Sequence, residues 1–348
     1  MNNTDAVWES LRATRWAPPG GAVATPERRR TYTFALEQAE QMFRAAEGVG
    51  TATRPLLVFY GLSQAGRAIA AAASAITTAD GWRLEGHGIR TVSKTLSGPL
   101  PDVLVASDKG GSRGSFVRLS EILDSPLFAD KVNPLALNAL WDCLPENRVA
   151  PLRDTGTSRR TPLYVAHLSL NREPHPLASA PVAYFPPWVV SSPEGGQTLV
   201  DYLAAFSDQV REFHSFVRVG HDPDAAPDFS SHHDGWGELR MNWILPHQKS
   251  GTFAERVKHL RSIGRTYDGD IYFFPAVGDA GQGRGLHPLM SWWAVLHTLS
   301  MLARYQPAEW AEQIDVDGSS YAAPVESLLK RAMQVVPRLV RETIEEVA

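Results

Sequence analysis

The sequence of 348 residues contains a single cysteine, Cys143. One thiol excludes an intramolecular disulfide and a cysteine-rich zinc site, and it fits a reducing compartment. The first residues lack a basic segment followed by an apolar stretch, and no run approaches the about 18 apolar residues of a membrane span. These absences predict a cytoplasmic protein that does not use a membrane as a partner.

The sequence also lacks an excess of charge of either sign, because 34 basic and 38 acidic residues give a formal net charge of −4. No bulk field therefore demands a nucleic-acid partner, and any basic binding site must be local. Hydrophobic residues make up 43% of the chain. This length and composition suffice for one elaborate domain or two closely packed ones.

Three regions differ in their patterns. Residues 1–144 alternate helical periodicity with Pro/Gly breaks and carry a Gly/Ser-rich hairpin insertion, and residues 145–285 contain β-rich runs bounded by Pro, Gly and Asp. Residues 286–348 are strongly helical and predict helices that pack on the first region. Thr25 and Pro26 predict a capped helix start. The whole predicts an α+β fold.

The stretch "LLVFYGLSQAGRAIAAAASAI", from Leu56 to Ile76, permits two interpretations. A strand, a sharp turn at Ser63 and a helix would form the nucleophile elbow of a serine hydrolase. The elbow needs the spacing G-x-S-x-G, whereas Gly61 and Gly66 give G-x-S-x-x-G. We therefore favour a single helix in which the two glycines admit neighbouring helices. A hydrolase using Ser63 stays open as a third functional hypothesis.

Several dispersed segments carry a family resemblance: "FYGLSQAGRAIAAA", "HGI" at 87–89, "GSFVRLSEIL", "LSMLARYQPAEW" at 299–310, and "VVPRLV". Together they resemble the YaaC-like family of bacterial proteins. The N-terminal part of that family is similar to the HEPN superfamily of helical bundles. Its members are often RNases with an R-x4-6-H motif, or nucleotide-binding partners in defence systems. The resemblance thus implies a HEPN-like helical bundle, RNA or a nucleotide as partner, and a defence or stress role.

Metal-independent RNA cleavage needs a histidine for proton transfer and an arginine for the phosphate charge. Two pairs offer this chemistry. Arg67 lies on the predicted helix and His87 in the loop that follows it, so this pair would be spatial instead of contiguous. The alternative, which we favour on the sequence alone, is that His87 caps a helix and Arg67 pairs with Glu85 or another carboxylate. Arg240 and His247 have the motif spacing, but Pro246 and a β-like run disfavour the helix on which the motif should lie.

Further arginines are candidate phosphate ligands. The glycine-rich segment "GDAGQGRGLHP" leads into a helix whose amides could hold phosphate, which makes Arg284 and His287 ligand candidates. Arg113, in a Gly/Ser-rich loop, and Arg304, in the C-terminal family segment, are the other two. The tryptophans of that region predict a core or a seam between the subunits of a homo-oligomer.

The segment "GHDPDAAPDFSSHHDGWGE" is the densest source of metal-ligand side chains. Its Pro/Gly/Ser content favours a solvated loop, so we predict no metal and no cofactor. If a metal bound there, His221, His232 and Asp234 would be the first ligands. The main alternative to nucleic-acid or nucleotide binding is a non-catalytic scaffold or regulatory subunit that binds a protein partner.

Overall fold

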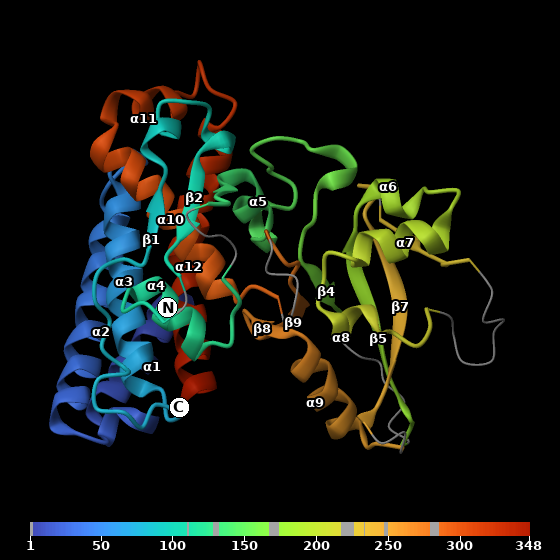
Figure 1. Ribbon diagram of the computed structural model, residues 1–348, viewed down its shortest axis with the longest axis horizontal. Coiled ribbons are helices and arrows are strands. Elements are labelled where there is room, and N and C mark those ends of the chain that lie inside the picture. Colours follow the sequence, from blue (N-terminus) through green and yellow to red (C-terminus); the bar gives the residue numbers. More distant parts are fainter. Residues whose placement is uncertain are drawn as a thin grey trace. The chain divides into compact units, whose positions relative to one another are not determined.

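The computed structural model describes residues 3–109, 111–127, 132–166, 174–216, 226–232, 234–246, 250–278 and 285–348. The chain forms two compact units (Figure 1). The helical unit comprises Met1–Asp154 and Leu286–Ala348, and the sheet unit comprises Thr155–Gly285.

The helical unit is built from long helices of both chain ends and shorter elements between them. Its helices are α1 (Asn3–Trp16), α2 (Pro26–Glu47), α3 (Arg54–Ala72), α4 (Ser115–Ile122), α5 (Leu137–Asp142), α10 (Pro288–Tyr305), α11 (Pro307–Gln313) and α12 (Ala322–Val347). Short 3-10 turns occupy Gly20–Val23, Ser93–Thr95, Leu100–Asp102 and Pro145–Asn147. Helix α3 packs against α2, α10 and α12, so the C-terminal helices complete the core begun by the N-terminal ones (Figure 1).

Local sequence explains how α2 begins and how α3 ends. The Thr25 side chain accepts a hydrogen bond from the Arg28 amide at 3.2 Å, and Pro26 occupies the first turn of α2. The buried Arg28 guanidinium donates to the carbonyl oxygens of Ala71, Ala73 and Ile76. These carbonyls lie at and beyond the end of α3, where the helix leaves its own acceptors unpaired. One arginine thereby joins two helices.

The helix interpretation of residues 56–76 is confirmed for α3, and Ser63 is a buried helix residue. A Cβ atom on Gly61 would lie 2.8 Å from the Phe43 ring of α2. A Cβ on Gly66 would lie 2.6 Å from Trp293 of α10. Both glycines therefore admit neighbouring helices, and the strand-turn-helix of an elbow is wrong for this stretch.

The loop that follows α3 leads into a small antiparallel sheet of the helical unit. Its order is β1-β2-β3, with bounds β1 (Ile89–Thr91), β2 (Leu104–Ser107) and β3 (Leu135–Ala136). Ile89 pairs with Ser107 and Leu104 with Ala136. The predicted hairpin insertion is thus the β1–β2 pair.

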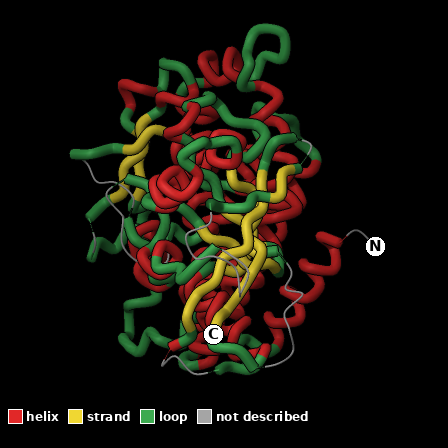
Figure 2. The backbone as a smooth tube through the Cα atoms, turned by 90° about the vertical axis from the view of Figure 1, so that its right-hand side faces the viewer, coloured by secondary structure: helices red, strands yellow, loops and turns green. Residues whose placement is uncertain are grey.

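The sheet unit contains a six-stranded antiparallel sheet of order β6-β7-β5-β4-β9-β8. Its strands are β4 (Leu163–Val165), β5 (Leu177–Phe185), β6 (Ser230–Ser231), β7 (Gly237–Ile244), β8 (Arg265–Tyr267) and β9 (Asp270–Phe273). Its helices are α6 (Pro187–Val190), α7 (Gly195–Leu203), α8 (Asp208–Arg211) and α9 (Phe253–Ile263), and a 3-10 turn spans Gly156–Ser158. Figure 2 draws the strands of the protein in yellow among the red helices.

Apolar side chains of this sheet that lie opposite one another on neighbouring strands share one face. Ala178 is opposite Trp243, and Leu163 is opposite Phe273. Side chains of α7 and α9, including Leu199 and Leu260, belong to the same buried cluster. Alternation along the strands thus provides one apolar face for the helices to cover.

The predicted α+β class is therefore confirmed, with helices at both ends of the chain and antiparallel sheets between them. The likeness to HEPN bundles stays a prediction. Within the described ranges no helix is long and apolar enough to cross a membrane.

Candidate functional site

A cluster of two histidines and two arginines lies on the helical unit, contributed by α3, the loop before β1, and α10. We call it the His87 cluster and define it as Arg67, His87, His297 and Arg304, with Phe59 and Tyr60 beside them. The ring centroids of His87 and His297 are 5.8 Å apart, and the Phe59 ring lies 5.9 Å from the first and 5.2 Å from the second.

The backbone fixes His87 in the loop between α3 and β1. Its carbonyl oxygen accepts a hydrogen bond of 2.9 Å from the Phe116 amide in the first turn of α4. The flanking Gly86 and Gly88 have φ angles of +59° and +69°, a left-handed backbone that glycine adopts without strain. At Gly88 a Cβ would also lie 2.8 Å from the Gly114 backbone. The loop is therefore held in one shape against α4.

The environment of His87, including the charges of Arg67 and Arg304, shifts its pKa. His87 is exposed as a residue while its ring packs on Phe59 and His297, and this partial burial lowers its pKa below the ordinary value. The positive charges of Arg67 and Arg304 lower the pKa of His87 further. Near neutral pH the imidazole is consequently uncharged, so it can accept a proton.

The guanidinium groups are oriented by neutral partners. Arg304 Nη1 donates to the Tyr60 hydroxyl at 2.7 Å, and Arg67 Nη1 donates to the Ser63 carbonyl and hydroxyl oxygens at 3.2 and 3.1 Å. Within the described part of the chain neither arginine has a carboxylate partner. Both positive charges are therefore available to an anion, and Ser63 is occupied as an acceptor.

His297 lies beneath this surface. It is 1% exposed, and its Nδ1 has no hydrogen-bond partner among the described residues. Burial and the neighbouring His87 lower the pKa of His297 to about 3, so its ring is neutral under ordinary conditions. It gives His87 a packing surface without adding charge.

The structure thus brings Arg67 and His87 together, as their positions in the sequence suggested, and adds Arg304 from the far end of the chain. Sequence reasoning had placed Arg304 among the ligand candidates but did not connect it with His87. It missed His297 and Tyr60. A histidine inside the apolar run of α10 was the available signal for His297.

The other sequence candidates lie elsewhere. Arg240 is on strand β7 of the sheet unit, where its Nη1 donates to the Ser179 hydroxyl at 3.4 Å. His247, its proposed partner, lies outside the described residues, as does Arg284. Residues 240–244 therefore lie in a strand and not in the helix that an R-x4-6-H motif would need.

His287 and Arg113 also have defined surroundings. His287 is 2% exposed and caps α10, since its Nδ1 accepts from the Leu289 amide at 3.1 Å and its Nε2 lies 3.2 Å from Glu346. Arg113 is highly exposed and lies 3.8 Å from the Glu85 carboxylate. A ligand role for either residue stays a prediction.

The metal-ligand segment is only partly described. His221 lies outside the described residues, whereas His232 and Asp234 lie in the turn between β6 and β7. Over the described ranges, no group of three or more His, Cys, Asp or Glu side chains could hold a metal ion.

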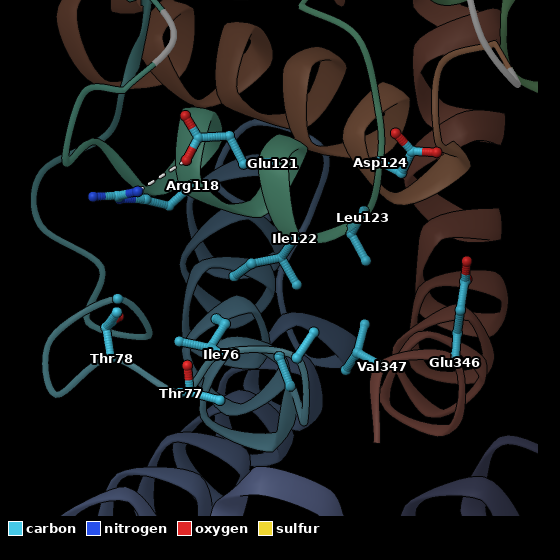
Figure 3. Close-up of a pocket in the computed structure, with 13 residues that line it drawn as sticks. Ile76, Thr77, Thr78, Arg118, Glu121, Ile122, Leu123, Asp124, Glu346 and Val347 are labelled. Atoms are coloured by element: carbon cyan, nitrogen blue, oxygen red, sulfur yellow. Dashed lines mark hydrogen bonds and ion pairs between the residues drawn. The ribbon is translucent and has the colours of Figure 1, made fainter.

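A cavity of about 500 Å³ opens where the end of α3, α4 and the end of α12 meet (Figure 3). Ile76, Ile122 and Val347 form apolar walls. On the rim, Arg118 is paired with Glu121 at 3.0 Å. The carboxylates of Glu121, Asp124 and Glu346 line this cavity, so its chemistry is less suited to a phosphate than that of the His87 cluster.

Comparison with known proteins identifies a family. The sequence model of the YaaC-like protein family matches residues 14–344. No curated protein and no solved structure matches the chain. The match includes every residue of the His87 cluster.

Proposed function

The chain belongs to the YaaC-like family, and we propose that its His87 cluster binds the phosphate of RNA or of a ribonucleotide. The observation that carries this proposal is that the positive charges of two arginines lower the pKa of one partly exposed histidine. Neither arginine is paired with a carboxylate among the described residues. Arginine forks match phosphate oxygens, and hydrogen bonds to charged groups are stronger than neutral ones.

Binding is tested by fluorescence anisotropy with a labelled single-stranded RNA, an equivalent DNA, and a ribonucleoside monophosphate as competitor. Loss of one charge-assisted contact in Arg304→Ala should weaken RNA binding by about tenfold or more. The slope of log affinity against log salt should also fall by about 0.7, because one fewer counterion is released from a single strand.

Arg331→Ala is the matched control. Arg331 is exposed on α12 in the same unit, so its removal changes the net charge equally. Equal losses for Arg304→Ala and Arg331→Ala would contradict a specific site, and wild-type protein that binds none of the probes would leave the scaffold or regulatory role.

A second candidate function, metal-independent RNA cleavage, is favoured by the position of a neutral imidazole, His87, beside the positive charges of Arg67 and Arg304. The neutral imidazole would take the proton of a ribose 2′-hydroxyl while the 2′-oxygen attacks the adjacent phosphorus. The bond from phosphorus to the 5′-oxygen then breaks, and the leaving oxygen takes a proton from water. The products are a 2′,3′-cyclic phosphate and a 5′-hydroxyl. Arg67 and Arg304 would stabilise the phosphorane charge.

Cleavage is measured on end-labelled RNA in the presence of EDTA. We expect cyclic-phosphate ends from wild type, none from His87→Ala, and no cut where the 2′-hydroxyl is replaced by hydrogen. Cleavage that persists in His87→Ala would exclude this role of His87. Binding without cleavage by wild type would leave the binding function alone.

A further inference from the structure

A second feature of the helical unit lies next to the His87 cluster: a groove between α2 and α3 with a volume of about 690 Å³. The groove is lined on the α2 side by Arg30, Phe34 and Gln38 and on the α3 side by Gln64 and Arg67. Arg67 therefore belongs both to the groove and to the charges acting on His87.

The charge of this α2–α3 groove is positive. Within the described residues, Arg30 and Arg67 have no ion pair. The acidic lining residue, Glu27, accepts a hydrogen bond of 2.7 Å from Nη2 of Arg83, whose Nη1 also lies 3.2 Å from the Asp80 carboxylate. Two guanidinium groups thus remain for an anionic ligand.

The groove also offers an aromatic surface. Phe34 is 57% exposed, which is unusual for a phenylalanine on a helix whose other large apolar side chains are mostly buried. An exposed ring lets a planar base stack on it. The amides of Gln38 and Gln64, which make no hydrogen bond among the described residues, can donate to and accept from base edges.

The groove and the cluster follow one face of α3. Tyr60, Gln64 and Arg67 are separated by helical spacings of four and three residues, so their side chains form one stripe. The stripe begins where Tyr60 accepts from Arg304 and ends at Arg67 in the groove. A strand of nucleotides that places one phosphate at Arg304 and His87 can continue along it.

We infer that the α2–α3 groove holds the neighbouring nucleotide of a single-stranded RNA, with a base stacked on Phe34 and a backbone phosphate between Arg30 and Arg67. This inference rests on the proposed function of the His87 cluster. It makes the preferred substrate an oligonucleotide instead of a mononucleotide, because a mononucleotide fills only one of the two positions.

The test compares affinities for a single-stranded RNA of roughly ten nucleotides, a length within the usual range for such sites. Phe34→Ala should weaken binding about fivefold or more through lost stacking, whereas Phe34→Trp should retain it. Arg30→Ala should weaken binding and lower the salt slope by about 0.7. None of these changes should alter the affinity for a mononucleotide bound at the cluster.

Trp16→Ala is the matched control, since Trp16 is another exposed aromatic of the helical unit, at 86% exposure. Thermal unfolding verifies that each variant is folded. If wild type binds RNA and Arg304→Ala weakens it, but Phe34→Ala and Arg30→Ala bind like wild type, the groove inference is wrong and the cluster stands. If wild type binds no RNA, both proposals fail.

Discussion

Acid should destabilise the helical unit through His297. This imidazole is 1% exposed, packs on Phe59 and lacks a partner for Nδ1 among the described residues. Burial, followed by the neighbouring charge of His87, lowers the pKa of His297 from 6.5 to about 3. In the unfolded chain the ring regains its ordinary pKa.

The sign follows from this difference. Because the folded pKa is below the unfolded one, the unfolded chain binds more protons between these two values. The contribution of His297 is therefore complete above about pH 6.5 and decreases as the pH falls toward about 3. With about 1.4 kcal/mol per pKa unit, the free energy of unfolding should drop by roughly 2 kcal/mol at about pH 5 and roughly 4 kcal/mol at about pH 3.

Cys143 provides the assay. It is the chain's only thiol and is buried in the helical unit, so its reaction with a pyridyl disulfide during urea unfolding reports that unit separately from the sheet unit. His297→Phe keeps a ring of similar size but cannot titrate. We expect its loss of stability between about pH 7.5 and pH 5 to be roughly 2 kcal/mol smaller than that of wild type.

His232→Ala is the control for removal of a histidine, because His232 is exposed and belongs to the sheet unit. It should keep the pH dependence of wild type. The reasoning is refuted if wild type and His297→Phe lose the same free energy over this pH range, since His297 would then bind protons equally in both states.

Two further predictions concern helix packing. Gly66→Ala should destabilise the protein by about 1–3 kcal/mol in thermal unfolding, because the new methyl group would lie 2.6 Å from Trp293. Gly50→Ala, with open space around its Cβ, should change the stability little. Equal effects of the two substitutions would contradict the close packing at Gly66. Arg28→Met should lower the free energy of unfolding in urea by about 3 kcal/mol or more, because buried carbonyl oxygens lose their hydrogen-bond donors. Arg29→Met, which changes an exposed side chain, should keep a stability near that of wild type. A mild effect of Arg28→Met would mean that water replaces those bonds.

Local patterns predicted much of the fold. Thr25 and Pro26 fixed the start of α2, and the spacing of Gly61, Ser63 and Gly66 was enough to favour a helix over an elbow. Such features depend on neighbouring residues and are visible in a sequence. The pairing order of the six-stranded sheet depends on contacts between distant segments, and no local pattern specified it.

The candidate site shows the same limit. Arg67 and His87 are close in the sequence, so their pairing could be proposed from a helix and its following loop. Arg304 reaches the same place from 244 residues beyond Tyr60, to which it donates a hydrogen bond. Spacing carries no information about such a contact. The contiguous Arg240–His247 spacing, by contrast, begins on a strand.

The dispersed family resemblance has a physical explanation in this arrangement. Its N-terminal segment supplies Tyr60 on α3, and its C-terminal segment supplies Arg304 on α10, and these two side chains are hydrogen bonded. In the same C-terminal segment Trp310 of α11 is 2% exposed and donates to the Ala52 carbonyl, just before α3, at 3.0 Å. Two of the matching segments therefore carry side chains that join α10 to α3 and α11 to the residues just before α3. Because the hydrogen bond to Tyr60 orients the exposed Arg304 side chain, binding of the phosphate proposed above would not have to order that side chain first.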